Sequence, residues 1–123
     1  MKCRNKTVFV VALLFTGIIT AKAEEKFGVK VYAGAKYDAS TSKTVTETMS
    51  VNAACYRTSD SVAKVAEFYK KQPGLESIDV SKEGAMFKKG NVDITIQNPW
   101  MDMKSGQMMK DTLISIVKTS EDN

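Results

Sequence analysis

Residues 59–74, SDSVAKVAEFYKKQPG, decide the fold class. Their apolar residues recur at the i, i+3, i+4 and i+7 spacing of one helix face: Val62, Val65, Ala66 and Tyr69, with Phe68 widening the stripe. Ser59 or Asp60 can cap the first turn, and Pro73-Gly74 ends the helix at about Gln72. A short helix is marginal alone in water, so we expect this one to bury its apolar face against a sheet.

Alternation of apolar and polar residues predicts strands before this helix. Residues 27–32, FGVKVY, are expected to form a first short strand that ends in a tight turn at Ala33-Gly34-Ala35. Residues 43–56, KTVTETMSVNAACY, predict a long strand half buried in an antiparallel sheet. Its apolar face would hold Val45, Met49, Val51, Ala53 and Cys55.

Four more strands are predicted after the helix. Residues 75–81 and 85–89 suggest a hairpin around Gly84, because glycine readily adopts the positive φ of a turn. Residues 91–97, NVDITIQ, alternate cleanly, whereas residues 112–118, TLISIVK, are apolar on both faces and so belong inside the sheet. A polar tail follows from Ser120. The prediction is an α+β fold, with one amphipathic helix packed on a mainly antiparallel sheet of about five or six strands.

Residues 1–23 have the pattern of a removable export signal. Three basic residues precede the uncharged apolar run Val8–Ile19, and Ala21-Lys22-Ala23 supplies the small residues of a cleavage site. We therefore expect a signal peptide over 1–23 and a single exported α+β domain over 24–123, located in the periplasm or secreted. The apolar run is shorter than the ~20 residues that span a bilayer as a helix, so we expect no stable membrane span after signal removal.

The charge of the mature domain is balanced. Of 18 Lys and Arg residues, four lie in the signal segment, which contains no acid, and this leaves 14 bases against 14 acids. The formal charge of +4 therefore describes the precursor, and nothing in the composition favours nucleic-acid binding. Of the two cysteines only Cys55 remains after residue 23, which precludes an intramolecular disulfide. We expect Cys55 to be a small buried hydrophobic residue, with a reactive or dimer-forming thiol as the alternative.

The chain lacks histidine, and with it the commonest general base and a common zinc ligand. Asp93, Asp102 and Asp111 stand nine residues apart, unlike the ligands of a compact calcium loop, and no glycine-rich phosphate loop is present. We therefore predict no enzymatic activity and no cofactor. Hydrolysis by a serine with a lysine, or by paired carboxylates, is the alternative that this composition leaves open.

The segment 99–110, PWMDMKSGQMMK, is the most unusual stretch. It holds the only tryptophan, Trp100, and four of the six methionines after residue 23: Met101, Met103, Met108 and Met109. One interpretation is a hairpin turn at Lys104-Ser105-Gly106, with Trp100 and some methionines packed on the end of the domain. A second is an exposed patch for an envelope protein partner, because tryptophan and methionine are enriched at adaptable interfaces.

A third interpretation is a metal site. Methionine thioethers are soft ligands that select Cu(I), and Met101, Met103, Met108 and Met109 are the candidate ligands for Cu(I) or Ag(I). Trp100-Met101-x-Met103 resembles the tryptophan and Met-x-Met set of periplasmic copper and silver chaperones. Those chaperones also use a histidine, which this chain lacks.

The chain also resembles a loose group of small exported bacterial proteins. The resemblance is carried by Tyr32-Ala33-Gly34-Ala35-Lys36, by Tyr56-Arg57-Thr58-Ser59-Asp60-Ser61-Val62 at the helix start, by Phe68-Tyr69-Lys70 at its end, and by the closing Leu113-Ile114-Ser115-Ile116-Val117. Ala33 replaces the proline of the group's usual Tyr-Pro-Gly-Ala turn. The resemblance implies a fold and a compartment, and it transfers no catalytic residue.

The leading functional hypothesis is an exported, non-enzymatic binding module of the bacterial cell envelope. Its candidate partner-binding residues are Trp100, Met101, Met103, Met108 and Met109. The alternative is a periplasmic Cu(I) or Ag(I) carrier that uses the loop 100–109. The sequence leaves the oligomeric state and the identity of the partner open.

Overall fold

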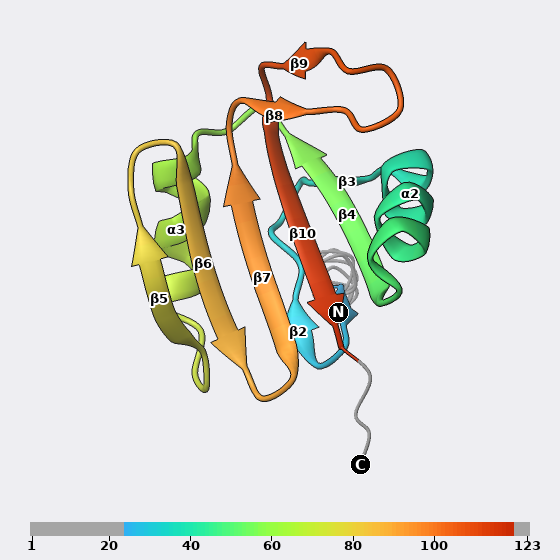
Figure 1. Ribbon diagram of the computed structural model, residues 1–123. Coiled ribbons are helices and arrows are strands. Elements are labelled where there is room, and N and C mark those ends of the chain that lie inside the picture. The colour runs from blue at the N-terminus through green and yellow to red at the C-terminus, as the bar shows by residue number, and fades with distance from the viewer. Residues whose placement is uncertain (1–23, 120–123) are drawn as a thin grey trace, which may run out of the picture.

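The fold is α+β and centres on one antiparallel sheet (Figure 1). The computed structural model describes residues 24–119, so the predicted signal over 1–23 and the tail from Ser120 lie outside the described residues. Six strands form the main sheet in the order β3-β4-β10-β7-β6-β5. They are β3 (Lys36–Tyr37), β4 (Asn52–Thr58), β5 (Glu76–Val80), β6 (Gly84–Lys89), β7 (Val92–Gln97) and β10 (Thr112–Lys118).

Two helices and two small hairpins complete the described part of the chain. The helices are α2 (Ala39–Met49) and α3 (Val62–Lys70). The hairpins are formed by β1 (Glu25–Lys26) with β2 (Val29–Lys30), and by β8 (Trp100–Met101) with β9 (Met108–Met109). In residues 24–119 no helix has both the length and the apolarity to cross a membrane.

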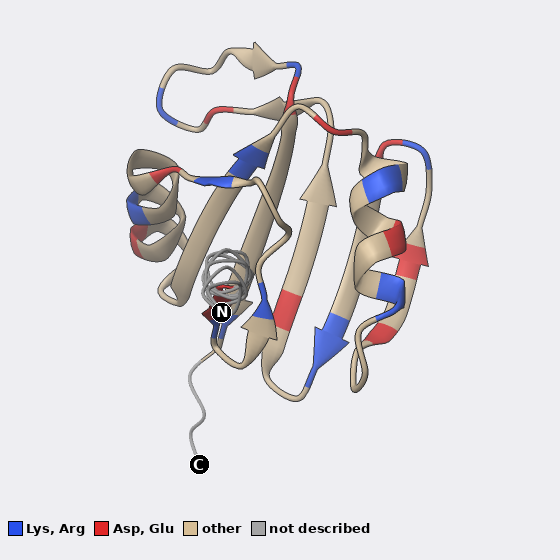
Figure 2. Cartoon of the chain, turned by 180° about the vertical axis from the view of Figure 1, so that it is seen from behind, with Lys and Arg blue, Asp and Glu red and all other residues tan. Residues whose placement is uncertain are grey.

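The helix predicted from residues 59–74 is confirmed as α3. Its cap is Ser61, one or two residues later than expected, and the Ser61 hydroxyl accepts a hydrogen bond from the Lys64 amide. The predicted face is buried against the sheet, and Figure 2 shows acidic and basic residues on the helix surface that faces away from it. The core under α3 includes Tyr56, Phe87, Ile94, Ile96, Ile114 and Ile116, each at most 2 % exposed.

The strands predicted after α3 are confirmed with small shifts of their ends. β10 lies inside the sheet between β4 and β7, as its two apolar faces predicted. The alternation in NVDITIQ is also confirmed, because Val92, Ile94 and Ile96 are buried while the residues between them are not. Gly84 is not at positive φ and belongs to β6, where the backbone amide of Ser81 donates to its carbonyl at 2.7 Å.

The N-terminal prediction was right about the turn and wrong about the strand. Residues 27–32 are not one strand, because Phe27 and Gly28 adopt positive φ and form the turn of the β1-β2 hairpin. The following turn does occur: Gly34 has a φ of 87°, and the Ala35 amide donates to the Tyr32 carbonyl at 3.1 Å.

The long strand predicted over 43–56 was wrong. Residues Ala39–Met49 form α2, Ser50 ends the helix in the left-handed conformation, and only the remainder enters β4. Asp38 caps the helix, since its carboxylate accepts from the Thr41 amide at 3.0 Å and from the Thr41 hydroxyl at 2.8 Å. Val45 and Met49 therefore lie on α2 rather than on a strand face with Cys55.

The serine and threonine residues of α2 explain why a helix lies here. The Ser42 hydroxyl accepts from the Cys55 amide at 2.7 Å and donates to the Asp38 carbonyl at 2.8 Å. One turn later, the Thr46 hydroxyl accepts from the Ala53 amide at 3.1 Å. Because i and i+4 share one helix face, these hydroxyls satisfy successive edge amides of β4 where no further strand pairs with it.

We predict that Ser42→Ala destabilises the fold by about 1–3 kcal/mol, because it leaves the buried Cys55 amide without its acceptor. Thr48→Ala is the matched control, since Thr48 is exposed on the same helix. It should change the free energy of unfolding by less than about 0.5 kcal/mol. Chemical denaturation measures both values, and equal effects of the two substitutions would contradict the role assigned to Ser42.

Candidate functional site

The two faces of the main sheet are covered very differently. Helix α3 and the β1-β2 hairpin cover one face. On the other face, strands β6, β7 and β10 are in open view in Figure 1, with α2 along one side and the β8-β9 hairpin across one end. The uncovered part of this face forms a groove with a volume of about 490 Å³.

The groove is lined by residues from five elements and the β8-β9 loop. The α2 wall contributes Thr41, Thr44, Val45 and Met49, and the hairpin end contributes Trp100, Met101, Asp102 and Met103. The sheet contributes Met86, Asp93, Thr95, Gln97, Leu113, Ser115 and Val117. Four methionines thus meet at one concavity, and their exposed fractions of 37–59 % leave much of each side chain open to a ligand.

The β8-β9 hairpin divides the five predicted site residues between two faces. Trp100 is paired with Met109, and Met101 with Met108, so each pair shares one face. The inner pair belongs to the core: Trp100 is 3 % exposed and packs with Cys55 and Leu113, and Met109 packs against this cluster. Met101, Met103 and Met108 are more than half exposed. Of the predicted set, Trp100, Met101 and Met103 line the groove, and Met108 and Met109 do not.

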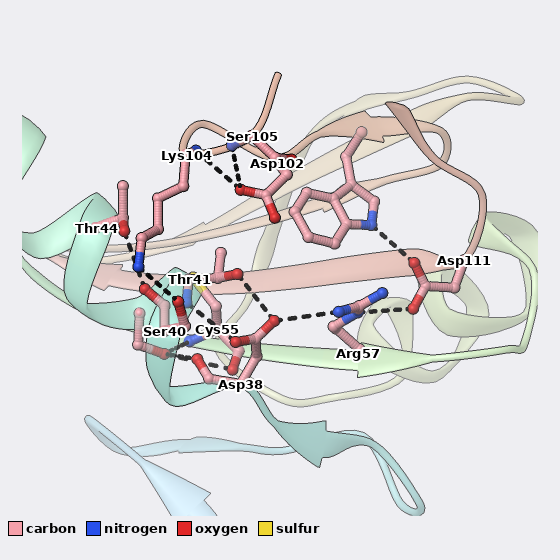
Figure 3. Close-up of polar contacts among 12 residues, drawn as sticks. Asp38, Ser40, Thr41, Thr44, Cys55, Arg57, Asp102, Lys104, Ser105 and Asp111 are labelled. Carbon is pink, nitrogen blue, oxygen red and sulfur yellow. Dashed lines mark hydrogen bonds and ion pairs between the residues drawn. The ribbon is translucent and has the colours of Figure 1, made fainter. Parts of the chain in front are cut away.

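A charged cluster fixes the hairpin end of the groove (Figure 3). Arg57 lies between two carboxylates, with its Nε 2.8 Å from Asp111 Oδ2 and its Nη1 3.4 Å from Asp38 Oδ2. Trp100 joins the cluster, since its indole Nε1 donates to Asp111 Oδ1 at 3.0 Å and the Arg57 guanidinium lies 5.1 Å from its ring centroid. Elements α2, β4, β8 and the start of β10 are therefore linked through one guanidinium.

This cluster lowers the pKa of both carboxyls. Partial burial alone would raise the pKa of Asp38, but hydrogen bonds from Thr41 and the charge of Arg57 outweigh it and hold that pKa below the ordinary value. The same balance lowers the pKa of Asp111, where Arg57 and the Trp100 indole donate the hydrogen bonds. The Asp111 hydrogen bond in turn raises the pKa of Arg57, so all three groups remain charged at neutral pH.

The predicted turn at Lys104-Ser105-Gly106 is present. Asp102 Oδ1 accepts from the amides of Lys104 and Ser105 at 2.9 and 3.4 Å, and Gly106 adopts a φ of 76°. The Lys104 ammonium reaches across to the Ser40 hydroxyl at 3.3 Å, which ties the loop to the start of α2 (Figure 3). The loop is thus anchored at both sides of the groove end.

Cys55 is fully buried, as expected for a small core residue. Its Sγ lies 3.5 Å from the hydroxyl of Ser115, a residue that lines the groove from below. Burial raises the pKa of the thiol, although the contact with Ser115 opposes this shift, so Cys55 is neutral and shielded rather than reactive. Within residues 24–119, no three Cys, Asp or Glu side chains are grouped so that they could hold a metal ion.

The sequence did not single out Met49 and Met86 as site residues. The sequence pattern placed Met49 on a predicted strand, whereas this residue lies on α2. It placed Met86 on a strand without deciding which face of the sheet the side chain occupies. A signal for Met86 is available, however, because its neighbours Ala85 and Phe87 are buried under α3 and alternation then places Met86 on the opposite face.

Comparisons with protein-family models, with curated proteins and with solved structures find no match to this chain. The resemblance to small exported proteins therefore stays a prediction, and the function has to be inferred from the geometry of the groove.

We predict that Arg57→Met destabilises the protein by about 1–3 kcal/mol at about pH 7, and by less at about pH 3. The carboxyls of Asp38 and Asp111 have folded pKa values below the ordinary 3.8, so their contribution is complete well above 3.8 and is lost as the pH falls below it. Without Arg57 this loss becomes smaller. Urea denaturation at both pH values measures the difference, and Lys64→Met on the exposed side of α3 is the control. An equal effect of Arg57→Met at both pH values would contradict the assigned charge coupling.

Proposed function

We propose that this protein is an exported, non-enzymatic binding module of the bacterial cell envelope that holds an apolar segment in the groove. The observation that carries the proposal is that four exposed methionines from α2, β6, β8 and the loop after β8 line one concavity of about 490 Å³. Pockets that bind small ligands have volumes of about 300–1,000 Å³ and are lined mainly by apolar side chains around a few polar groups.

Methionine suits such a surface. Its unbranched thioether side chain adopts many shapes at little cost, and it is over-used at surfaces that accept varied apolar partners. Between the methionine walls, the hydroxyls of Thr95 and Ser115 and the amide of Gln97 offer a few polar contacts. A ligand that covers this face would therefore bury thioethers and still satisfy the polar groups of the floor.

Binding rather than catalysis is supported by the state of the two carboxylates in the groove. Asp93 is 2.9 Å from the Lys88 ammonium, and Asp102 accepts two amides of its own loop. Both carboxylates are therefore already engaged as acceptors, Asp93 by an ammonium and Asp102 by backbone amides, which is the arrangement of structural groups rather than of a free general acid or base. The proposal of export rests on the pattern of residues 1–23.

We predict that the protein binds the neutral apolar dye N-phenyl-1-naphthylamine with an increase in fluorescence. Met103→Glu should weaken binding at least about tenfold, because it puts a charge among the apolar contacts. Met108→Glu is a closely matched control: both side chains are 52 % exposed and lie in the same hairpin, but only Met103 lines the groove. Absence of binding, or equal weakening by both substitutions, would contradict the proposal.

A specific contact favours the Cu(I) or Ag(I) carrier as a second candidate function. Met101 and Met108 are directly opposite each other across the β8-β9 pair, with the Cβ separation of about 4.5–5.5 Å that such pairs have. Met103 follows in the connecting loop, and all three are exposed. Met101 and Met108 can thus offer two thioethers to one soft cation, with Met103 of the loop as the candidate third ligand, whereas Met109 packs against the core cluster.

For this second function we predict one Ag(I) ion per chain in native mass spectrometry. Met108→Leu should abolish metal binding, since it removes one of three ligands, while Met49→Leu should leave it intact. Because Met108 lies outside the groove, its substitution separates metal binding from dye binding. Retention of the metal by the Met108→Leu variant would eliminate the three-methionine site.

A further inference from the structure

The methionines of the described residues differ in their access to solvent. Four of them line the groove and are called the groove methionines: Met49, Met86, Met101 and Met103. These four and Met108 are exposed, whereas Met109 packs against the core cluster that contains Trp100. The thioethers that a dissolved reagent can reach are therefore gathered mainly at the proposed binding site.

The two other side chains that are most prone to oxidation in the described part of the chain are shielded. Cys55 is fully buried, and burial raises the pKa of its thiol, so the reactive thiolate is scarce. Trp100 is 3 % exposed, and its indole nitrogen is bonded to Asp111. An oxidant in solution therefore reaches the groove methionines and Met108 before it reaches the core.

An exposed thioether reacts with hydrogen peroxide in a two-electron step. The methionine sulfur attacks one peroxide oxygen, and an S–O bond forms as the O–O bond breaks. The transferred oxygen gives its proton to the departing hydroxide, so the products are one methionine sulfoxide and one water. The reverse step uses two thiols of a methionine sulfoxide reductase, which become a disulfide while the oxygen leaves as water.

Oxidation of the exposed methionines changes the groove and spares the core. None of them belongs to either buried core cluster of the described residues, so the fold keeps its buried contacts. In the groove, each sulfoxide replaces an apolar thioether by a polar group that is a strong hydrogen-bond acceptor. An apolar ligand would have to bury these acceptors without offering them a donor, and this is costly.

We propose that the groove methionines form a reversible oxidation site that switches binding off. With thioethers in its lining, the groove holds an apolar ligand, and with sulfoxides it releases that ligand while the domain stays folded. This inference rests on the proposed function and adds the regulation of the same site. Release follows for any apolar ligand, because the cost lies in the oxidised side chains of the groove itself.

Treatment of the purified protein with hydrogen peroxide at neutral pH tests this site. Peptide mass spectrometry should find one added oxygen at each groove methionine and at Met108, and oxidation of Met109 should be at least about threefold slower. After removal of the peroxide, binding of N-phenyl-1-naphthylamine should be at least about tenfold weaker, whereas the urea denaturation midpoint should be unchanged. The two stereospecific methionine sulfoxide reductases together, with dithiothreitol, should then restore dye binding.

Leucine substitutions assign the effect to the groove, because leucine is apolar and close to methionine in volume but has no sulfur to oxidise. One variant replaces all four groove methionines: Met49→Leu, Met86→Leu, Met101→Leu and Met103→Leu. Its ratio of dye affinities before and after peroxide should fall to about one, compared with at least about tenfold in the unsubstituted protein. Met108→Leu is the matched control, since Met108 and Met103 are both 52 % exposed but Met108 lies outside the groove. This control should keep the full sensitivity to peroxide.

The outcomes separate this inference from the proposed function. If the untreated protein binds the dye and the oxidised protein binds it equally well, the oxidation switch is overturned and the binding groove stands. A loss of binding that comes with unfolding, that the reductases do not reverse, or that persists in the leucine variant would also overturn the switch. If the untreated protein does not bind the dye, the proposed function fails and the switch fails with it.

Discussion

The guanidinium of Arg57, held between Asp38 and Asp111, is the interaction on which the groove depends. Through Asp38 it reaches the cap of α2, and through Asp111 it reaches the indole of Trp100. Arg57 on β4 therefore holds both α2 and the β8-β9 hairpin, which form two sides of the groove. Partly buried charges of this kind are costly when one partner is removed, so the cluster links the stability of the fold to the shape of the candidate binding surface.

The sheet serves two purposes because its side chains alternate. One face of β7 and β10 packs Ile94, Ile96, Ile114 and Ile116 under α3. The opposite face carries Asp93, Thr95, Gln97, Ser115 and Val117, and on this side the described residues form only a small second core cluster, from Cys55, Trp100 and Leu113. Helix α2 and the β8-β9 hairpin cover only its margins. The groove thus has a rigid floor formed by β7 and β10, and adaptable methionines line it. This combination suits the binding of a ligand better than a fully closed core would.

The sequence predicted those parts of the fold in which burial alone sets the pattern. Periodicity located α3, β6, β7 and β10, because their apolar residues face one core. It failed for residues 39–50, where hydroxyl-bearing residues at every second position imitate a strand. Asp38 caps a helix there instead, and the hydroxyls of Ser42 and Thr46 accept from β4 amides. Alternation could place Met86 on the groove face, but no local pattern brings Met49 and Met86 to the loop 99–110, because the three meet only in the tertiary structure. Burial of Trp100 depends on Asp111, a partner that no local pattern reveals.

The way in which the two edges of the main sheet are covered affects whether copies of this chain can pair edge to edge at high concentration. On one side, the short strand β3 pairs with the end of β4 and α2 lies beside the rest of it, where the hydroxyls of Ser42 and Thr46 already use the amides that an incoming chain would need. On the other side, β5 is exposed, but its pairing with β6 is irregular between Ser77 and Asp79. Neither border offers a straight ladder of free backbone groups, so the domain is protected against edge-to-edge polymerisation into fibrils.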